Sequence, residues 1–262
     1  MPLAQAHMKR TRRGAKGYRL RQLARLLEAG LYIALFFIFV YYLASYITGS
    51  GRYAVRNILV YGEGAVTTED VRAVARLDSR DNLLFLDREA VARRVAALPY
   101  VAGAEVQREF PNTIVITISE RKAVATLIAG RRAFLLDREG HVLRETEPSA
   151  EPIGPLITNV PELGVVTPGD RLAQPALQEA LALWDAFGPA PIAREVNVSE
   201  ISAESPVHLT MFLEEVPFAI RWGRSDYTMQ AERLSVLWRE KAGQLPCVEY
   251  LDLRFDEDLV CR

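Results

Sequence analysis

An uninterrupted apolar run near the N-terminus is the clearest feature of the hydrophobic pattern. Residues 29–51 carry no charge, and between Leu31 and Ile47 only Ser45 is polar. At 1.5 Å per residue, a helix of this length crosses a hydrocarbon core about 30 Å thick. The pattern therefore predicts a transmembrane helix over residues 29–51.

Two other interpretations of this run stay open. A cleaved signal peptide usually has an apolar region of about 7–15 residues that ends in small residues, and Thr48–Gly51 supplies small residues. A buried helix of a soluble protein would normally be interrupted by polar positions. The length of the run, and tyrosines near its end that suit a membrane interface, favour an uncleaved anchor. These tyrosines are Tyr41, Tyr42 and Tyr46.

After residue 52 the pattern changes to short alternating segments. Apolar and polar residues alternate along 53–62, which predicts a strand, and Thr67–Asp70 has the form of a capping box that opens a helix over about 68–76. Asp87 is placed to cap a second helix, which ends at Leu98-Pro99. Ala104–Arg108 and Thr113–Glu120 then form a hairpin whose second strand alternates strictly. One face of this strand is predicted to carry Ile114, Ile116 and Ile118.

The remainder, 122–262, consists mostly of short strand-like segments. Eight candidates occur, at Ala123–Ile128, Ala133–Leu136, His141–Leu143, Ala193–Val198, Val207–Leu213, Phe218–Trp222, Val248–Leu253 and Leu259–Cys261. Two helices interrupt them, one from Pro175 to Gly188 and one over about 226–242. The stretch from Pro148 to Pro161 is predicted to be a long irregular connection.

Charge divides the chain on either side of the apolar run. Residues 1–28 hold eight Lys and Arg against one acid, whereas residues 52–262 hold 24 bases against 32 acids. Basic residues beside a span stay on the cytoplasmic side. We therefore expect residues 1–28 to be cytoplasmic and residues 52–262 to lie outside. Binding of nucleic acid or of anionic lipid is the alternative role for the basic tail.

Residues suited to catalysis or metal binding do not cluster along the sequence. His7, His141 and His208 have no second ligand at metal-binding spacing. No nucleophile elbow, P-loop or dinucleotide-binding motif occurs. The prediction is a protein that is not an enzyme and has no catalytic residues, no cofactor, no metal, no small-molecule substrate and no nucleic-acid partner.

The order of these motifs resembles the FtsQ/DivIB family of bacterial cell-division proteins, over essentially all of 9–262. The motifs that carry the resemblance are Val55–Gly62, Thr67–Asp70, Leu98–Val101, Ala104–Arg108, Phe110–Thr113, Glu120-Arg121, Leu136-Asp137 with Gly140, and Tyr250–Phe255. Two departures occur: Lys122-Ala123 stands where the family often has proline, and 152–170 lacks a leucine-proline landmark. The resemblance implies an α+β protein. Its parts are a cytoplasmic tail at 1–28, a single transmembrane helix at 29–51, a β-α-α-β-β POTRA domain at 52–121 and a mostly antiparallel β domain with two helices at 122–262.

The function implied by the resemblance is that of a scaffold of the division machinery. Such a protein lies in the inner membrane at the septum, links cytoplasmic and periplasmic division proteins, and contacts membrane lipid and other division proteins. Two alternatives from other classes are a membrane-anchored enzyme acting on peptidoglycan and a POTRA-bearing transport or chaperone subunit. The first lacks a recognisable catalytic group, and the second usually needs repeated POTRA domains.

The last strand is the candidate partner site. With a turn at 256–258, Leu259–Arg262 forms an edge strand whose N–H and C=O groups are available to a partner strand. A terminal edge blunted by its shortness and charged flank is the alternative. The resemblance implies that a member of the FtsB/FtsL pair adds a strand here. The residues expected to bind are Arg254, Phe255, Leu259, Val260, Cys261 and Arg262, and proline at Val260 is expected to remove an N–H that the added strand would use.

The two cysteines are expected to be free thiols. In an extended hairpin with its turn at Asp256-Glu257, Cys261 faces Asp252, and Cys247 lies five residues further along, about 16 Å away. A disulfide requires Cα atoms within about 7 Å. Both cysteines are therefore predicted to pack as small apolar groups.

Overall fold

The computed structural model describes residues 4–49, 51–62, 64–224, 226–255 and 260–262, and in the first helix it describes the side chains of residues 24–47. The chain divides into two compact units. One consists of residues 1–58, 77–86 and 108–114, and the other consists of 59–76, 87–107 and 115–262.

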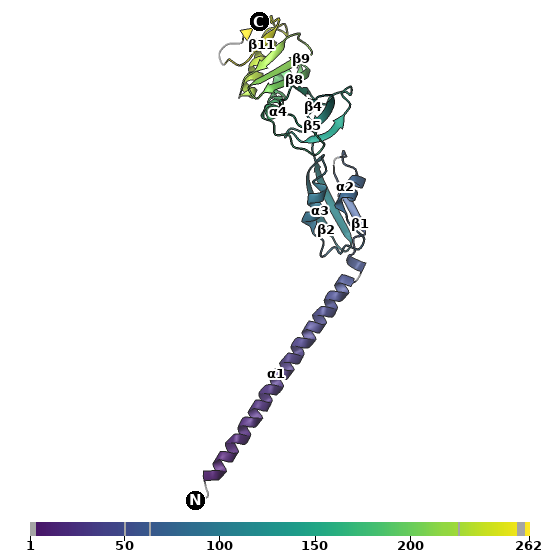
Figure 1. The fold of residues 1–262 in the computed structure, drawn as a ribbon, viewed down its shortest axis with the longest axis vertical. Coiled ribbons are helices and arrows are strands. Elements are labelled where there is room, and N and C mark those ends of the chain that lie inside the picture. Colours follow the sequence, from purple (N-terminus) through teal and green to yellow (C-terminus); the bar gives the residue numbers. More distant parts are fainter. Residues whose placement is uncertain (1–3, 50, 63, 225, 256–259) are drawn as a thin grey trace. The chain divides into compact units, whose positions relative to one another are not determined.

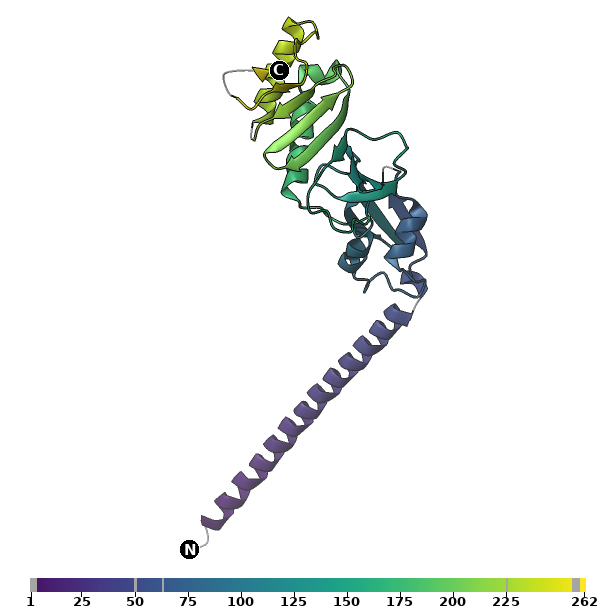
Figure 2. The same ribbon diagram turned by 45° about the horizontal axis from the view of Figure 1, so that its top comes forward.

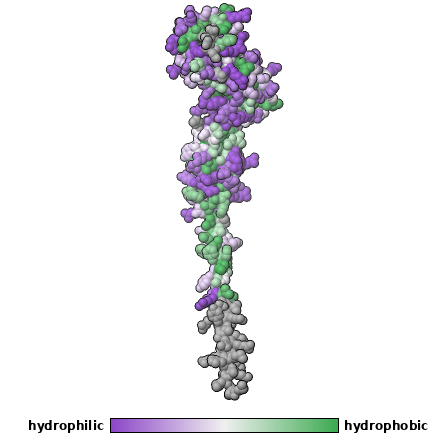
Figure 3. Space-filling model, turned by 90° about the vertical axis from the view of Figure 1, so that its left-hand side faces the viewer, coloured by the Kyte–Doolittle hydropathy of each residue, from purple (hydrophilic) through white to green (hydrophobic). Residues whose placement is uncertain are grey.

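Helix α1 (Ala4–Gly49) contains residues 29–49 of the predicted span 29–51. It continues without a break from the basic tail into the apolar run, and the stretch Ala24–Ile47 is long and apolar enough to cross a membrane by length and composition. Figure 3 shows this stretch as a largely apolar surface. None of it is buried, so the alternative of a buried core helix is not supported. The short 3₁₀ helix η1 (Gly51–Tyr53) follows.

The segment 57–120 has the expected β-α-α-β-β order (Figure 1). It comprises β1 (Asn57–Tyr61), α2 (Thr68–Ala75), α3 (Arg88–Val95), β2 (Val101–Glu109) and β3 (Thr113–Glu120), and the sheet order is β1-β3-β2. The capping box at the start of α2 is present: Thr67 Oγ1 accepts from the Asp70 N–H, and Asp70 accepts from the Thr67 N–H. Asp87 caps α3. The three isoleucines of β3, which were predicted to share one face, are all buried.

The segment 125–262 forms one mixed sheet of nine strands in the order β12-β11-β10-β9-β8-β7-β4-β5-β6. Five of the eight neighbouring pairs are antiparallel, so the sheet is mostly antiparallel as expected. The strands are β4 (Ala125–Ala129), β5 (Arg132–Leu136), β6 (Val142–Thr146), β7 (Leu156–Thr158), β8 (Val198–Ser205), β9 (His208–Leu213), β10 (Ala219–Trp222), β11 (Tyr250–Asp252) and β12 (Val260–Cys261).

Two helices and a 3₁₀ turn complete this sheet domain: α4 (Pro175–Phe187), η2 (Pro191–Arg194) and α5 (Tyr227–Glu240). Helix α4 begins at Pro175 in the first turn and ends at its cap Gly188, as predicted. It packs against α5 and against β8, on one face of the central strands (Figure 2). Apolar side chains from both helices and the sheet form a single core, in which the Phe187 and Trp222 rings meet edge to face at 6.1 Å between centroids.

Two sequence expectations for this domain are wrong. The stretch 148–161 is not irregular throughout, because it contains β7, which pairs in parallel with both β4 and β8. The predicted strand 193–198 begins instead as the turn η2, and the strand in this region is β8, which starts at Val198 and runs to Ser205. Proline at 191 begins η2, and the buried Ile192 anchors it to the core.

Candidate protein-interaction site

The sheet ends at β12, the last strand in the order of the described strands. Strand β12 pairs antiparallel with β11, with Leu251 opposite Cys261 and Asp252 opposite Val260. The arginine that follows β12 continues the ladder, because the Arg262 N–H donates to the Tyr250 C=O at 3.0 Å. The other edge of β12 has no neighbouring strand among the described residues, so it has the form of a site for strand addition.

The two cysteines are joined in a disulfide, which contradicts the prediction of free thiols. The Cα atoms of Cys247 and Cys261 lie 5.1 Å apart. Two features of the backbone were not anticipated. Cys261 faces Leu251 rather than Asp252, and the chain before β11 is bent rather than extended. Since the N–H groups of Val248 and Glu249 both donate to the single carbonyl of Arg262, at 2.8 and 2.7 Å, the chain wraps around the end of β12 and brings the cysteines together.

The register also decides which backbone groups of β12 face outward. In an antiparallel pair, residues that exchange both N–H···O=C bonds alternate with residues whose N–H and C=O groups point away. Arg262 and Tyr250 exchange both bonds, at 3.0 and 3.4 Å. Val260, two residues earlier, therefore faces β11, and Cys261 presents its N–H and C=O to the free edge. The expectation that proline at Val260 removes an outward N–H is wrong, and the residue in that position is Cys261.

An ion pair fixes the end of β11. The buried Asp252 carboxylate accepts from Nε and Nη2 of Arg254, the shortest contact being 2.6 Å, and also from the Arg254 backbone N–H. Burial alone raises the pKa of Asp252, but these hydrogen bonds and the charges of Arg254 and Arg221 together lower the pKa below its ordinary value. Asp252 is therefore a charged structural group that orients Arg254, rather than a proton donor or acceptor in a reaction.

Of the predicted binding residues, Val260, Cys261 and Arg262 lie in or directly after β12, whereas Arg254 and Phe255 follow β11, and Arg254 lies beside Gly223 at the end of β10. The side chain of Arg254 is one-third exposed, Phe255 is 51% exposed and Val260 is 39% exposed. Cys261 and Arg262 are also exposed, and Arg262 Nε lies 3.3 Å from the Glu249 carboxylate. Leu259 and the predicted turn at 256–258 lie outside the described residues.

Three residues of this region were missed at the sequence level. Val248 is 78% exposed at the bend, the Arg221 guanidinium lies over the Tyr250 ring at 3.8 Å from its centroid, and Arg233 Nη2 donates to the Phe255 C=O. Nothing in the sequence pattern links Arg221 to β11. Arg221 lies next to Tyr250 only because β10 pairs in parallel with β11.

A second polar cluster lies at the start of the nine-stranded sheet. Asp137, Glu139 and His141 place ligand atoms close enough together to hold a metal ion. The guanidinium of Arg121 already supplies a cation there, with Nη1 at 2.7 Å from Asp137 Oδ2 and 2.9 Å from His141 Nδ1. Burial raises the pKa of Asp137, but the backbone N–H groups of His141 and Glu139 and the Arg121 side chain together lower it. The chemistry of the cluster is that of an ion-pair network.

Glu120, next to this arginine, has a different partner. Its carboxylate accepts the successive backbone N–H groups of Gly64, Ala65 and Val66, at 3.2, 2.9 and 2.8 Å. Burial raises the pKa of Glu120, but the three N–H groups lower it overall. The Glu120 carboxylate therefore binds the loop before α2, and the Arg121 guanidinium binds the turn before β6.

Comparison with known protein families shows to which family the chain belongs. Residues 53–121 match the family model described as POTRA domain, FtsQ-type, and residues 125–254 match the model described as Cell division protein FtsQ/DivIB, C-terminal. The chain belongs to the FtsQ/DivIB family of cell-division proteins.

Individual relatives agree with this assignment. A protein named Cell division protein FtsQ from Mycobacteroides abscessus is 35% identical over 70% of this chain and 55% of its own length. Proteins of the same name from Syntrophotalea carbinolica and Mycobacterium tuberculosis are 26% and 32% identical, over 81% and 70% of this chain and 75% and 54% of their own lengths. The chain thus spans about half the length of the mycobacterial relatives it matches. The matched C-terminal domain ends at residue 254, just before the exposed Phe255 and β12.

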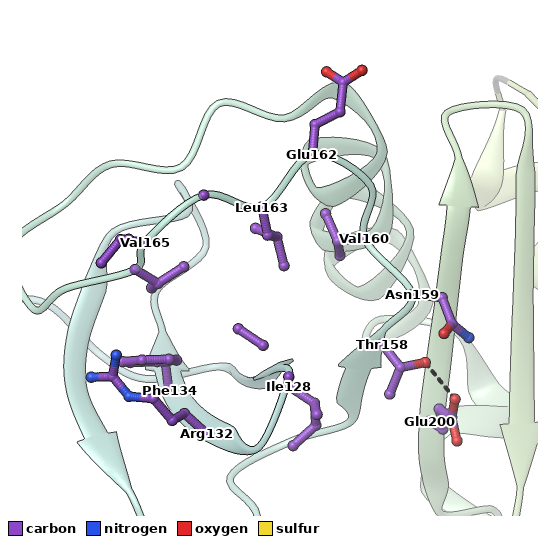
Figure 4. Close-up of a pocket in the computed structure, with 14 residues that line it drawn as sticks. Ile128, Arg132, Phe134, Thr158, Asn159, Val160, Glu162, Leu163, Val165 and Glu200 are labelled. Carbon is purple, nitrogen blue, oxygen red and sulfur yellow. Dashed lines mark hydrogen bonds between the residues drawn. The ribbon is translucent and has the colours of Figure 1, made fainter.

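A cavity of about 900 Å³ opens elsewhere on the domain that matches the FtsQ/DivIB model (Figure 4). It lies among β4, β5 and the loop 159–166, and the side chains of Ile128, Phe134 and Leu163 are among those that line it. The hydroxyl of Thr158 donates to Glu200 at its margin, and Arg132 lies over the Phe134 ring. The carboxylates among its lining residues are Glu162 and Glu200, and Glu200 accepts the hydrogen bond from Thr158.

Proposed function

We propose that this chain is a non-enzymatic scaffold of the bacterial division machinery, and that it binds an FtsB/FtsL-like partner by strand addition to β12. The observation that carries the proposal is the geometry of that edge. Strand β12 ends the sheet, the disulfide ties it at Cys261, and by register the N–H and C=O of this same residue face outward. Membership of the FtsQ/DivIB family supports the division role.

The binding residues proposed are Arg254, Phe255, Leu259, Val260, Cys261 and Arg262. In this proposal the backbone of β12 supplies the hydrogen bonds, and exposed side chains beside it supply apolar contact. Phe255 and Val260 are the candidates for that contact, since each exposes apolar surface that a partner would remove from water. Arg254 is held in place by Asp252, and in this proposal it makes polar contacts with the partner at the margin of the interface.

The proposed topology places 1–28 in the cytoplasm, 29–51 across the inner membrane, and the POTRA domain (52–121) and β domain (122–262) in the periplasm at the septum. The basic tail and the apolar helix support this arrangement. The disulfide is an independent argument, because structural disulfides persist in oxidising compartments such as the periplasm and are rare in the cytosol. Membrane lipid is the partner of the span.

A matched pair of double variants tests strand addition. Cys247→Ala with Cys261→Pro, and Cys247→Ala with Cys261→Ala, both lack the disulfide, but only the first lacks the outward N–H at position 261. Affinity of the full chain in detergent is measured for the periplasmic part of an FtsB-like partner. Because a lost backbone donor leaves a partner carbonyl unpaired, at about 1–3 kcal/mol, the proline variant should bind about 10- to 100-fold more weakly than the alanine variant.

A side-chain variant provides a second measurement. Phe255→Ala should weaken binding by about 2 kcal/mol if the ring is an interface anchor, with an unchanged thermal midpoint because the side chain is half exposed. The exposed Val165, far from β12 in sequence, serves as the matched control when changed to alanine. Equal binding by the proline and alanine variants would show that the partner docks elsewhere than on β12.

A further inference from the structure

Two exposed phenylalanines lie in the unit of the chain that contains α1. Phe85 is 69% exposed in the first loop (77–86), and Phe110 is 56% exposed in the second loop (108–114), which is the turn between β2 and β3 with the adjoining strand ends. A single exposed apolar residue is ordinary on a protein surface. These two are different because both loops are bonded to the short segment that leaves the apolar helix.

The bonds to that segment are direct. In the first loop, the Leu83 N–H donates to the Tyr53 C=O at 2.7 Å, and the Asp81 C=O accepts from the Val55 N–H at 3.0 Å. In the second loop, the Asn112 C=O accepts from the Arg56 N–H at 2.9 Å. The ring of Phe110 also meets the ring of Tyr53 edge to face, with 6.3 Å between centroids.

The chain length between this segment and the helix places both loops near the end of the span. Tyr53 follows Gly49, the last residue of α1, by four residues, and an extended chain of that length reaches at most about 14 Å. The polar interface on each side of a hydrocarbon core is about 5–8 Å thick. Aromatic rings favour this interface. The exposed Arg52, between α1 and the loops, adds a positive charge that anionic headgroups attract.

We propose that the loops 77–86 and 108–114 form a membrane-contacting surface, in which Phe85 and Phe110 enter the headgroup region of the bilayer that α1 crosses. The proposal rests on the proposed span. The proposed binding partner of this surface is lipid rather than protein, because the short connection to α1 keeps both rings within reach of the bilayer surface. Such contact would hold the first domain against the membrane in addition to the covalent link.

Site-specific fluorescence on the full chain in vesicles tests this surface. Phe85→Cys and Phe110→Cys are prepared separately and labelled with an environment-sensitive fluorophore, since Cys247 and Cys261 are joined and do not react. The vesicles contain phosphatidylethanolamine and phosphatidylglycerol, with or without spin-labelled lipid as a quencher. Leu43→Cys within the span is the positive control, and Glu69→Cys, exposed in the first turn of α2, is the negative control.

The expected result is several-fold stronger quenching by the spin-labelled lipid at positions 85 and 110 than at position 69. Phe85 has no aromatic contact among the described residues, so its variant keeps the test valid if loss of the Phe110–Tyr53 contact disturbs the second loop. Quenching at 43 with none at 85 and 110 would overturn this inference alone, whereas no quenching at 43 would overturn the span as well. Shielding at 85 and 110 that appears only after a division protein is added would assign the surface to a protein partner and also overturn the inference.

Discussion

Removal of the Cys247–Cys261 disulfide should release β12 from the sheet while the rest of the domain stays folded. The perturbation is the double change Cys247→Ser with Cys261→Ser, which replaces each sulfur by an oxygen and removes only the crosslink. Strand β12 has two residues, and it is joined to the chain before it through residues 256–259. The crosslink is the covalent attachment that fixes its register against β11.

The magnitudes follow from the contacts of residues 260–262. The Arg262 N–H and C=O make four bonds to the segment 248–250, three of which share the one carbonyl, and Val260 faces Asp252 across the ladder. Because the shared carbonyl weakens the individual bonds, these contacts together contribute about 4 kcal/mol. Fixing three residues costs about 3–6 kcal/mol of conformational entropy. The two terms nearly cancel, so docking without the crosslink is close to neutral or unfavourable. The disulfide joins residues 14 apart in sequence, and a loop of that size corresponds to about 3 kcal/mol in the chain-entropy account.

Hydrogen exchange is the assay that separates local release from global unfolding. The amides of Val260 and Arg262 should lose most of their protection in the double serine variant. The amide of Met211, in the buried centre of β9, should keep its protection and serves as the internal reference. The free energy of global unfolding should fall by no more than about 3 kcal/mol. Unchanged protection at Arg262 would refute the reasoning, because the ladder alone would then be sufficient to hold β12.

Three further predictions concern the Glu120-Arg121 pair. Glu120→Gln should lower the urea-derived free energy of unfolding by about 1–2 kcal/mol, because an amide oxygen replaces a carboxylate that accepts three N–H groups. The control Glu105→Gln, on the exposed side of β2, should change this free energy by less than about 0.5 kcal/mol. Arg121→Met should cost about 2 kcal/mol, because it leaves the buried Asp137 carboxylate without its cation, whereas Arg138→Met, in a more exposed ion pair, should cost less than about 1 kcal/mol. The folded-state pKa of Glu120 is lowered, so the ionised carboxylate stabilises the fold above the ordinary value of 4.5, and this stabilisation is lost as the pH falls through the lower folded value. In an acid titration of unfolding, Glu120→Gln should remove this part of the pH dependence.

The first domain was predictable because its signals are local. The capping box at Thr67 and Asp70, the cap at Asp87 and the strict alternation of Ile114, Ile116 and Ile118 each act over a few residues, and all are present in the structure. Where local preference and tertiary packing agree, the sequence pattern is a sufficient guide.

The centre of the large sheet was less predictable, because its strands are defined by their neighbours. Strand β7 has three residues between Pro155 and Pro161, and its identity depends on parallel pairing with β4 and β8, far away in sequence. Strand β8 contains serine, glutamate and alanine, which have weak strand preference, yet Ser202 and Ala203 are buried in the middle of the sheet. Pairing and burial overrode intrinsic preference at both strands.

At the candidate site, sequence reasoning gave the strands and their edge but not the register. A shift of one residue exchanges the groups that face the neighbouring strand with those that face outward. Opposite Asp252 the structure has Val260 rather than Cys261, and the bend at Val248 and Glu249 shortens the path that an extended strand would take. The disulfide and the outward N–H of Cys261 both follow from these two features.

The same disulfide links the partner site to the compartment in which the domain folds. A chain produced in a reducing cytoplasm should carry two thiols, countable by alkylation and mass spectrometry, and its β12 should be released from the sheet. Partner affinity of the reduced chain should then be lower than that of exported chain, because ordering three residues costs about 3–6 kcal/mol on binding, offset in part by the ladder bonds that re-form. Oxidation of the reduced chain to the disulfide should restore the affinity. Equal affinity before and after oxidation would mean that the partner does not require an ordered β12, and the proposed site would have to move to another surface.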